Sequence, residues 1–342
     1  MTASSAATTH ALTIPRLGFL GVGWIGRQRM RALHEDGGVR AVALADVDAA
    51  ARAAAAADIP GIAAVKTLDE LLSAGVDGIV IATPSALHAE QAVTALERGV
   101  AVFCQKPLGR TAAEAARVVA AARGADRPLA VDLSYRTLRA TAEARQVIAQ
   151  GDIGSCFAAE LVFHNGYGPD KPWFSSRRLA GGGCLVDLGT HLLDLGLWLT
   201  GARGATVESA RLLRRGDPLR DAGDDAVEDF AVAQLVTDSG VTMRMACSWH
   251  LPVGRDCAFE CTVFGTDGAV SIRNVDGSFY DFVARRHHGT RSELLTEPPD
   301  PWGPRALATW AGALAAGRGF DAEADELTDR AAILDEIYRV GT

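Results

Sequence analysis

Residues 16–36 read RLGFLGVGWIGRQRMRALHED, and this stretch decides the fold of the first third of the chain. Leu17–Leu20 is a short apolar run without alternation, which is typical of a strand buried on both faces of a parallel sheet. The glycine-rich hexapeptide GVGWIG follows at once, and Ile25–Glu35 is predicted to be a helix. A strand, a tight glycine turn and a helix in this order predict the first unit of a βαβ fold.

The same alternation continues to about Asp132 and then changes. Up to that point short apolar strands (Ala41–Ala45, Ile79–Ala82, Val100–Cys104, Leu129–Asp132) are separated by helical stretches (Asp48–Ala57, Leu68–Ala74, Ala86–Arg98, Ala112–Arg123). After it, longer and partly alternating strands dominate (Ser155–His164, Val207–Leu213, Val227–Thr237, Val241–Trp249, Phe259–Phe264, Ala269–Arg273, Phe279–Ala284), with helices at Thr141–Gln150, Cys184–Leu199, Arg305–Ala316 and Glu323–Arg339. We therefore expect a flexible leader over residues 1–15, an α/β nucleotide-binding domain of the Rossmann type over 16–134, and an α+β domain with an open, mainly antiparallel sheet over 135–342.

The composition excludes several classes of protein. The net charge of −8 and the absence of a Lys/Arg-rich stretch argue against nucleic acid as a partner. No apolar run approaches the ~20 residues of a membrane-spanning helix, so no membrane association is expected. The six cysteines have no paired ligand spacing, which predicts reduced thiols in a cytoplasmic protein and no metal site.

The hexapeptide also predicts a dinucleotide site. Gly21 permits the turn, Gly23 lets the backbone approach a pyrophosphate, and Gly26 allows close packing of the helix on the strand. The first residues of that helix, Trp24 and Ile25, contribute backbone N–H groups toward the phosphates. Asp46 stands 20 positions after the last glycine, where a carboxylate can bind ribose hydroxyls and repel a 2′-phosphate. This favours NAD over NADP, although Asp46 or Asp48 could instead be no more than an N-cap of the next helix.

Three further motifs carry a family resemblance. They are TPSALH at residues 83–88, QKP at 105–107 and GGGCLVDLGTH at 181–191. In order and spacing, and together with the glycine turn, they resemble the Gfo/Idh/MocA oxidoreductases over nearly the whole chain. That resemblance implies a nucleotide-binding domain followed by an open sheet, with NAD(P) between them, and hydride transfer to or from a sugar, an inositol or a related polyol.

The resemblance also assigns residues to the site. Cofactor contacts are expected from Thr83, Pro84, His88, Gln105 and Lys106 in addition to the glycine turn and Asp46. Two positions depart from the family pattern, because Gln105 replaces the usual Glu and Ser85 the common Asn. The resemblance further implies a cis peptide between Lys106 and Pro107.

Acid–base chemistry is expected from the last motif. His191 has an ordinary pKa near ~6.5, which suits proton exchange with a hydroxyl group. Asp187 lies four residues earlier, so on an α-helix both side chains share a face and the carboxylate can orient the imidazole or bind substrate. Lys106 follows a central strand and can stabilise a developing alkoxide, as the resemblance also implies.

Substrate contacts are expected from Tyr135, Arg136 and Trp173 in addition to Asp187 and His191. Asp194 could contact substrate or face solvent, and the loop with Arg177-Arg178 could form a lid or simply a solvated pair. Two other functions compete with a dehydrogenase, namely a redox-neutral glycosidase or lyase that retains NAD, and a non-catalytic NAD-binding sensor. A sheet with one uncovered face predicts a homodimer or homotetramer.

Overall fold

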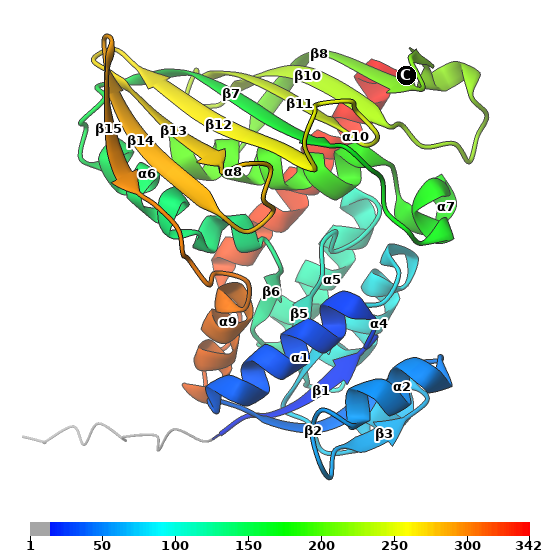
Figure 1. The fold of residues 1–342 in the computed structure, drawn as a ribbon. Helices are drawn as coiled ribbons and strands as arrows, with labels where there is room; N and C mark the ends of the chain where they lie inside the picture. The colour runs from blue at the N-terminus through cyan, green and yellow to red at the C-terminus, as the bar shows by residue number, and fades with distance from the viewer. Residues whose placement is uncertain (1–13) are drawn as a thin grey trace, which may run out of the picture.

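The chain folds into two stacked units joined by its C-terminal helices (Figure 1). The structure is a computed structural model that describes residues 14–342, so all but the last two residues of the predicted leader lie outside the described residues. The lower unit in Figure 1 holds a six-stranded sheet and the upper unit a nine-stranded sheet. This architecture confirms the expected fold class.

The six-stranded sheet is entirely parallel, in the order β3-β2-β1-β4-β5-β6. Its strands are β1 (Arg16–Leu20), β2 (Arg40–Ala45), β3 (Ala63–Val65), β4 (Gly78–Ile81), β5 (Ala101–Cys104) and β6 (Leu129–Val131). The helices that connect them are α1 (Trp24–Asp36), α2 (Ala49–Ala56), α3 (Leu68–Leu72), α4 (Ser85–Glu97) and α5 (Ala112–Ala125). This is the doubly wound order in which ligands bind beyond the carboxyl ends of the strands.

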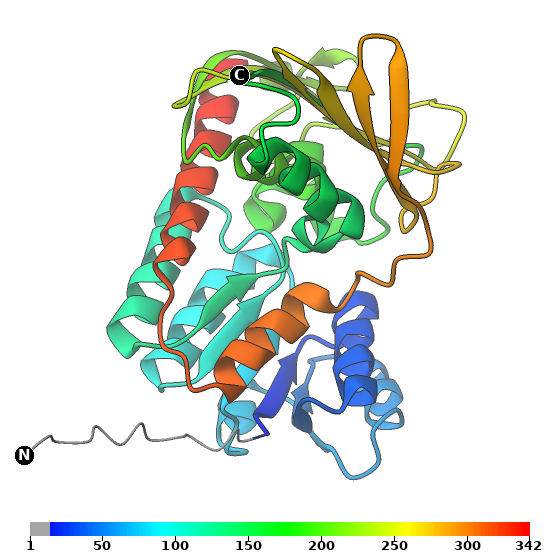
Figure 2. The same cartoon turned by 90° about the vertical axis from the view of Figure 1, so that its left-hand side faces the viewer.

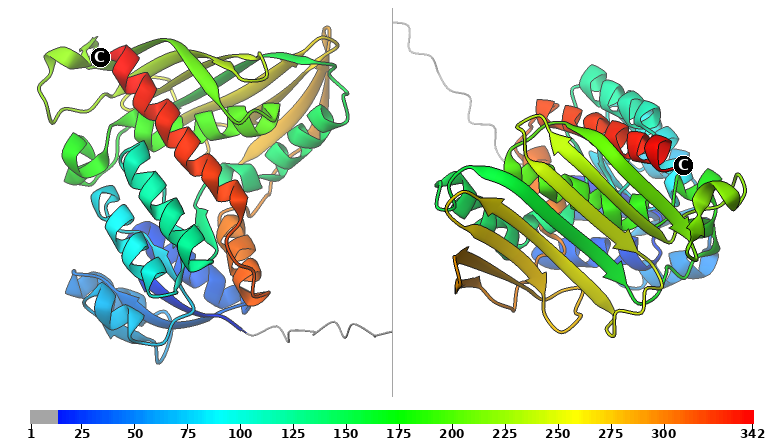
Figure 3. Two further views of the ribbon diagram at one scale, coloured as in Figure 1. Left: turned by 180° about the vertical axis from the view of Figure 1, so that it is seen from behind. Right: turned by 90° about the horizontal axis from the view of Figure 1, so that it is seen from above.

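The nine-stranded sheet has the order β15-β14-β13-β12-β7-β11-β10-β8-β9 and is antiparallel except for the pair of β7 and β11. Its strands are β7 (Cys156–Asn165), β8 (Ala205–Arg214), β9 (Asp217–Pro218), β10 (Phe230–Thr237), β11 (Thr242–Ser248), β12 (Cys257–Gly265), β13 (Ala269–Asn274), β14 (Phe282–His288) and β15 (Arg291–Thr296). The helices α6 (Arg139–Ala149), α8 (Thr190–Thr200) and α10 (Glu326–Gly341) cover one face. Figure 3 shows that the other face carries no helix of the described chain.

The C-terminal helices tie the two units together. Although it follows the second sheet, α9 (Arg305–Ala315) packs on the first, where Leu307 and Trp310 join the core around Phe103 (Figure 2). Trp310 Nε1 donates to the carbonyl of Pro128 at 3.2 Å. The helix α10 then contacts both α5 and β8. In a division of the chain at residue 135, both α9 and α10 therefore belong to the second unit by sequence and pack on the first.

Two general features bear on function. Among the described residues, no helix combines the length and the apolar character that crossing a membrane requires. Within residues 14–342, no group of three or more His, Cys, Asp or Glu side chains is arranged to hold a metal ion.

Candidate active site

A cavity of about 1270 Å³ lies between the two units. It extends from the turn after β1 to the start of α8, so it opens at the carboxyl ends of the parallel strands. Most residues that the sequence assigned to the site line it: Gly21, Gly23, Trp24, Ile25, Asp46, Thr83, Pro84, His88, Gln105, Lys106, Tyr135, Trp173, Asp187 and His191. Gly26 and Arg136 do not.

The glycine turn has the geometry that a dinucleotide requires. Gly21 has a φ of +83°, and a Cβ there would lie 2.6 Å from the carbonyl oxygen of Ala82. A Cβ at Gly26 would lie 2.0 Å from the carbonyl of Gly21, which accounts for its absence from the cavity wall. At Gly23, in contrast, nothing lies within 4 Å of an added Cβ. Gly23 thus leaves open space at the start of α1, where a pyrophosphate can approach the backbone N–H groups.

Asp46 lies directly after β2 and holds this turn. Its Oδ2 accepts from the backbone N–H of Val22 at 2.8 Å, and its Oδ1 accepts from that of Asp48 at 2.9 Å. Asp48, and not Asp46, is the N-cap of α2, because its side chain accepts from Ala50 N at 2.8 Å. Each carboxylate oxygen has more than one lone pair, so Asp46 can still accept from ribose hydroxyls.

Lys106 and Asp187 form an ion pair across the two units. Lys106 Nζ donates to the backbone carbonyl of Asp187 at 2.7 Å and also to its carboxylate Oδ1. Asp187 Oδ2 accepts from Trp249 Nε1 at 3.0 Å. Each carboxylate oxygen thus accepts from a side chain other than His191, and no hydrogen bond joins Asp187 to His191. The carboxylate orients Lys106 and not the imidazole.

The helix that carries these residues differs from the expected one. Leu185–Gly189 is a π-helical turn, and α8 begins only at Thr190. The backbone N–H of Thr190 bonds to the carbonyl of Leu185, five residues earlier. A wider π turn and not the expected α-helical turn therefore leads from Asp187 to His191, yet both side chains line the main cavity, as expected of residues that share a face. Single π turns inside helices occur frequently at functional sites.

His191 is buried beside this ion pair. It is 7% exposed, and its ring lies 4.8 Å from that of Tyr135, measured between centroids. Its Nδ1 is buried and has no hydrogen-bond partner among the described residues. Burial, and to a smaller extent the positive charge of Lys106, lower the pKa of His191 well below its ordinary value. This environment therefore favours the neutral imidazole, which is the form that can take up a proton.

Two residues expected in the site make contacts within the protein. The guanidinium of Arg136 points to Asp194, with Nε 2.6 Å from Oδ2, and Asp194 is only 2% exposed. Arg330 Nε lies 2.7 Å from the other oxygen of Asp194. His88 lines the cavity, but its ring nitrogens lie 2.7 Å from the carbonyls of Thr83 and Pro107. The first carbonyl follows β4 and the second follows β5, so His88 braces two strand ends.

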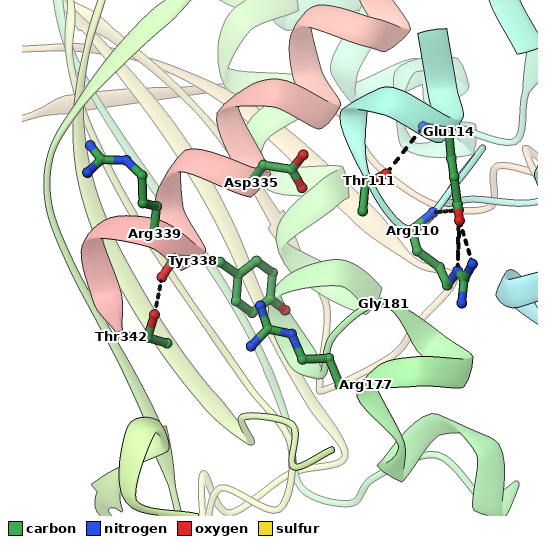
Figure 4. Close-up of a pocket in the computed structure, with 9 residues that line it drawn as sticks. All are labelled: Arg110, Thr111, Glu114, Arg177, Gly181, Asp335, Tyr338, Arg339 and Thr342. Carbon is green, nitrogen blue, oxygen red and sulfur yellow. Dashed lines mark hydrogen bonds and ion pairs between the residues drawn. The ribbon is translucent and has the colours of Figure 1, made fainter. Parts of the chain in front are cut away.

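The structure also shows where the Lys106–Pro107 peptide, Trp173, Arg177 and Trp302 lie. The peptide between Lys106 and Pro107 is cis, as the resemblance implied. The ring of Trp173 stacks on that of Phe174 at 3.8 Å. Arg177 lies over the ring of Tyr338 in a separate cavity of about 520 Å³ (Figure 4). Trp302 was given no role from the sequence, yet it lines the main cavity and packs on Tyr135.

Glu228 is a buried residue behind the site that the sequence gave no reason to single out. It is fully buried just before β10, and its Oε1 accepts from Gly183 N at 3.0 Å, Leu185 N at 2.9 Å and Tyr338 Oη at 2.9 Å. A Cβ at Gly183 would lie 1.9 Å from the carbonyl of Glu228. Glu228 therefore fixes the glycine loop from which the π turn with Asp187 starts.

We expect Glu228→Gln to change how stability depends on pH. Burial raises the pKa of Glu228 in the folded protein above that of the unfolded chain, about 4.3. The wild type should therefore lose stability as pH rises through this raised pKa, whereas glutamine carries no such dependence. Denaturant midpoints of both proteins should be measured between about pH 4.5 and 8. As the pH rises, the midpoint of the wild type should fall relative to that of the variant. If the midpoints of the two proteins changed with pH in parallel, the raised pKa of Glu228 would be contradicted.

Comparisons with known proteins agree with this geometry. Residues 15–133 match the sequence model described as "Oxidoreductase family, NAD-binding Rossmann fold", and residues 141–271 match "GFO/IDH/MocA C-terminal domain". The rhizopine catabolism protein MocA of Rhizobium meliloti is 31% identical over 75% of this chain and 78% of that protein. An inositol 2-dehydrogenase of Acidiphilium cryptum is 30% identical over 83% of this chain and 80% of that protein.

Solved structures share the fold. GenD2 from gentamicin A biosynthesis, solved with NAD, superposes with a TM-score of 0.80 at 24% identity, over 99% of this chain and 97% of that one. KijD10, a 3-ketoreductase from Actinomadura kijaniata, gives a TM-score of 0.83 at 20% identity, over 96% of this chain and 98% of that one. The order of the two units is thus the same in all three chains.

Proposed function

Because the chain belongs to the Gfo/Idh/MocA family of NAD-dependent oxidoreductases, we propose that it transfers hydride between NAD and a carbinol or carbonyl carbon of a sugar, an inositol or a related polyol. One observation carries this proposal. The Lys106–Asp187 ion pair and the neutral, buried His191 line one cavity together with the open glycine turn. A non-catalytic NAD sensor has no need of all three side chains.

Each side chain has a defined task in this proposal. NAD, when bound, supplies the acceptor of the hydride or its source. In the oxidative direction His191 removes the hydroxyl proton, and in reduction it returns that proton. The ammonium group of Lys106 donates to the reacting oxygen as negative charge develops there. Asp187, itself held by Trp249, keeps Lys106 in place.

The wall on the side of the second unit supports a carbohydrate-like substrate. Seven aromatic side chains lie there: Tyr135, Tyr167, Trp173, Phe174, Phe279, Tyr280 and Trp302. Such rings can pack on the C–H faces of a sugar or cyclitol ring. Among the relatives, a D-apiose dehydrogenase of Paraburkholderia graminis is 29% identical over 87% of this chain.

A spectrophotometric screen tests the proposal. Purified protein with NAD is offered a panel of inositols, aldoses and keto-sugars, and NADH formation or consumption is followed by its near-ultraviolet absorbance. We expect turnover of one stereochemical group. If NAD binds but the whole panel is inert, the hydride-transfer proposal fails for these substrates, and redox-neutral cleavage of glycosides becomes the function to assay.

We expect Asp46→Ser to weaken the preference for NAD over NADP. The wild-type carboxylate repels a 2′-phosphate, and removing such a like-charge contact should narrow the ratio of the two dissociation constants by about 10- to 100-fold. Titration of both reduced cofactors, followed by their fluorescence, measures this ratio. Asp48→Ser is the matched control, because Asp48 caps α2 without lining the cavity. An unchanged ratio in Asp46→Ser would show that Asp46 does not determine the preference for NAD.

We further propose that the protein is a homodimer or homotetramer. The face of the nine-stranded sheet opposite α6, α8 and α10 carries no helix of the described chain (Figure 3). An open sheet face of this kind is commonly buried against a second subunit. Sedimentation at micromolar concentration should give more than the monomer mass, and a monomer would contradict the proposal.

A cytoplasmic location is also proposed. All six cysteines are free, and five of them are buried. Unpaired thiols are typical of proteins in reducing compartments. Fractionation of the source cells, with detection by antibody, would test the location, and recovery outside the cytoplasmic fraction would contradict it.

A further inference from the structure

A second polar cluster lies beside the catalytic residues and has no role in the chemistry described above. It consists of Arg29 on α1, Gln105 after β5 and Asp132 after β6. Arg29 Nε lies 2.8 Å from Asp132 Oδ2, and the amide nitrogen of Gln105 donates to the same oxygen. All three side chains line the main cavity. We call this cluster the Arg29–Asp132–Gln105 network.

The network connects the dinucleotide turn to the catalytic ion pair. Arg29 lies on the helix that begins at the glycine turn, so it is rigidly attached to the phosphate-binding backbone. At the other end, Gln105 directly precedes Lys106, whose ammonium group is paired with Asp187. The hydrogen bond that anchors Gln105 to Asp132 therefore also anchors the backbone from which Lys106 extends.

The charge of the network is balanced only because residue 105 is neutral. Asp132 is 2% exposed, and its Oδ1 is buried without a hydrogen-bond partner among the described residues. One guanidinium therefore compensates one carboxylate. The family pattern has Glu at position 105, and a second carboxylate there would offer no amide hydrogen to Asp132 and would repel it.

We propose that Gln105 is a positioning residue, which fixes Lys106 through Asp132 and Arg29 and limits the network to one carboxylate, balanced by Arg29. The proposal rests on the proposed function, since it takes Lys106 to act on the substrate oxygen. It also predicts an effect on the cofactor. The nicotinamide ring is cationic in NAD⁺ and neutral in NADH, so the charge of this wall alters the relative affinity of the two forms.

Three variants test the network. Gln105→Glu adds a negative charge and removes the amide donor, and Asp132→Asn removes a negative charge. The double variant Gln105→Glu/Asp132→Asn exchanges donor and acceptor, so it restores both the hydrogen bond and the single charge. Gln146→Glu, on the exposed surface of α6, is the control for an added charge away from the cavity.

The first readout is binding and does not depend on the substrate. Calorimetry measures the dissociation constants of NAD⁺ and NADH for each variant. In Gln105→Glu the ratio of the two dissociation constants should shift in favour of NAD⁺ on the order of tenfold relative to the wild type. In Asp132→Asn this ratio should shift in favour of NADH. In the double variant it should return toward the wild-type ratio. The shift in Gln105→Glu should grow with rising pH, because the added carboxyl group, beside Asp132, ionises at a raised pKa.

Turnover is the second readout. Both single variants should lower kcat on the order of tenfold, and the double variant should recover most of this loss. Equal changes in both cofactor affinities, or a double variant no better than the single ones, would overturn the proposal. If the wild type turns over no polyol, the proposed function fails, while the ratio of cofactor affinities still decides whether the network acts as described.

Discussion

Lys106→Met should lower turnover by about 10²- to 10³-fold, the usual effect of removing one donor to a developing oxyanion. Methionine preserves the length of the side chain but cannot donate to the reacting oxygen. The affinity for NADH should change little, because the glycine turn and Asp46 are separate from Lys106. Steady-state kinetics and fluorescence titration of NADH measure the two quantities. Turnover close to that of the wild type would refute the role of Lys106.

A double variant separates donation to the substrate oxygen by Lys106 from simple neutralisation of Asp187. Lys106→Met leaves the carboxylate of Asp187 without its cation, and an unpaired, largely buried charge destabilises the fold. Lys106→Met/Asp187→Asn removes both charges, so its melting temperature should recover toward that of the wild type. Its turnover should stay low, because the donor to the substrate oxygen is still missing. Recovery of turnover would show that Lys106 only neutralises Asp187.

Most of the fold was predictable because its signals are local. Buried parallel strands such as Leu17–Leu20 are continuous apolar runs, and the glycine turn marks the junction of β1 and α1. The strands that the sequence missed lack such a signal. Ala63–Val65 is a three-residue edge strand with an alanine-rich sequence, and Arg291–Thr296 is an edge strand of mostly exposed residues. Pairing with a neighbouring strand, and not their own pattern, makes them strands.

The residues of the candidate site also divide into those with a local sequence signal and those without one. The residues found in advance belong to short motifs, whereas Arg29 and Asp132 meet across 103 positions of the chain. Glu228 lies in an acidic stretch that resembles a solvated loop, and only the fold places its carboxylate under Gly183. No spacing rule in a single sequence reveals contacts of this range.

Arg136 shows how two adjacent residues can differ in their access to the cavity. Tyr135 and Arg136 are adjacent in the turn Ser134–Thr137, and both were expected to reach the substrate. Only Tyr135 lines the cavity, where it packs on His191. Adjacent side chains on a 3₁₀ turn point in different directions, so the neighbour of a cavity residue faces the protein core. Here that core contains Asp194, which pairs with Arg136.

His191→Ala should lower turnover by at least about 10², the scale of a lost acid–base group, and leave NADH affinity largely intact. The small side chain leaves space in the cavity, so added imidazole should restore part of the activity. His191→Asn, which cannot exchange the proton, should be equally slow without rescue. Near-wild-type turnover in His191→Ala would refute the assignment.

The pH dependence of the wild type tests the same residue without a mutation. Because burial and Lys106 lower the pKa of His191, the imidazole stays neutral below its usual value of about 6.5. The acid limb of kcat/KM for alcohol oxidation should therefore lie below about pH 6.5. A limb at or above that pH would contradict the environment described for His191. In Lys106→Met the charge that disfavours the imidazolium is gone, so the acid limb of the residual activity should move to higher pH. This measurement links the roles proposed for Lys106 and His191.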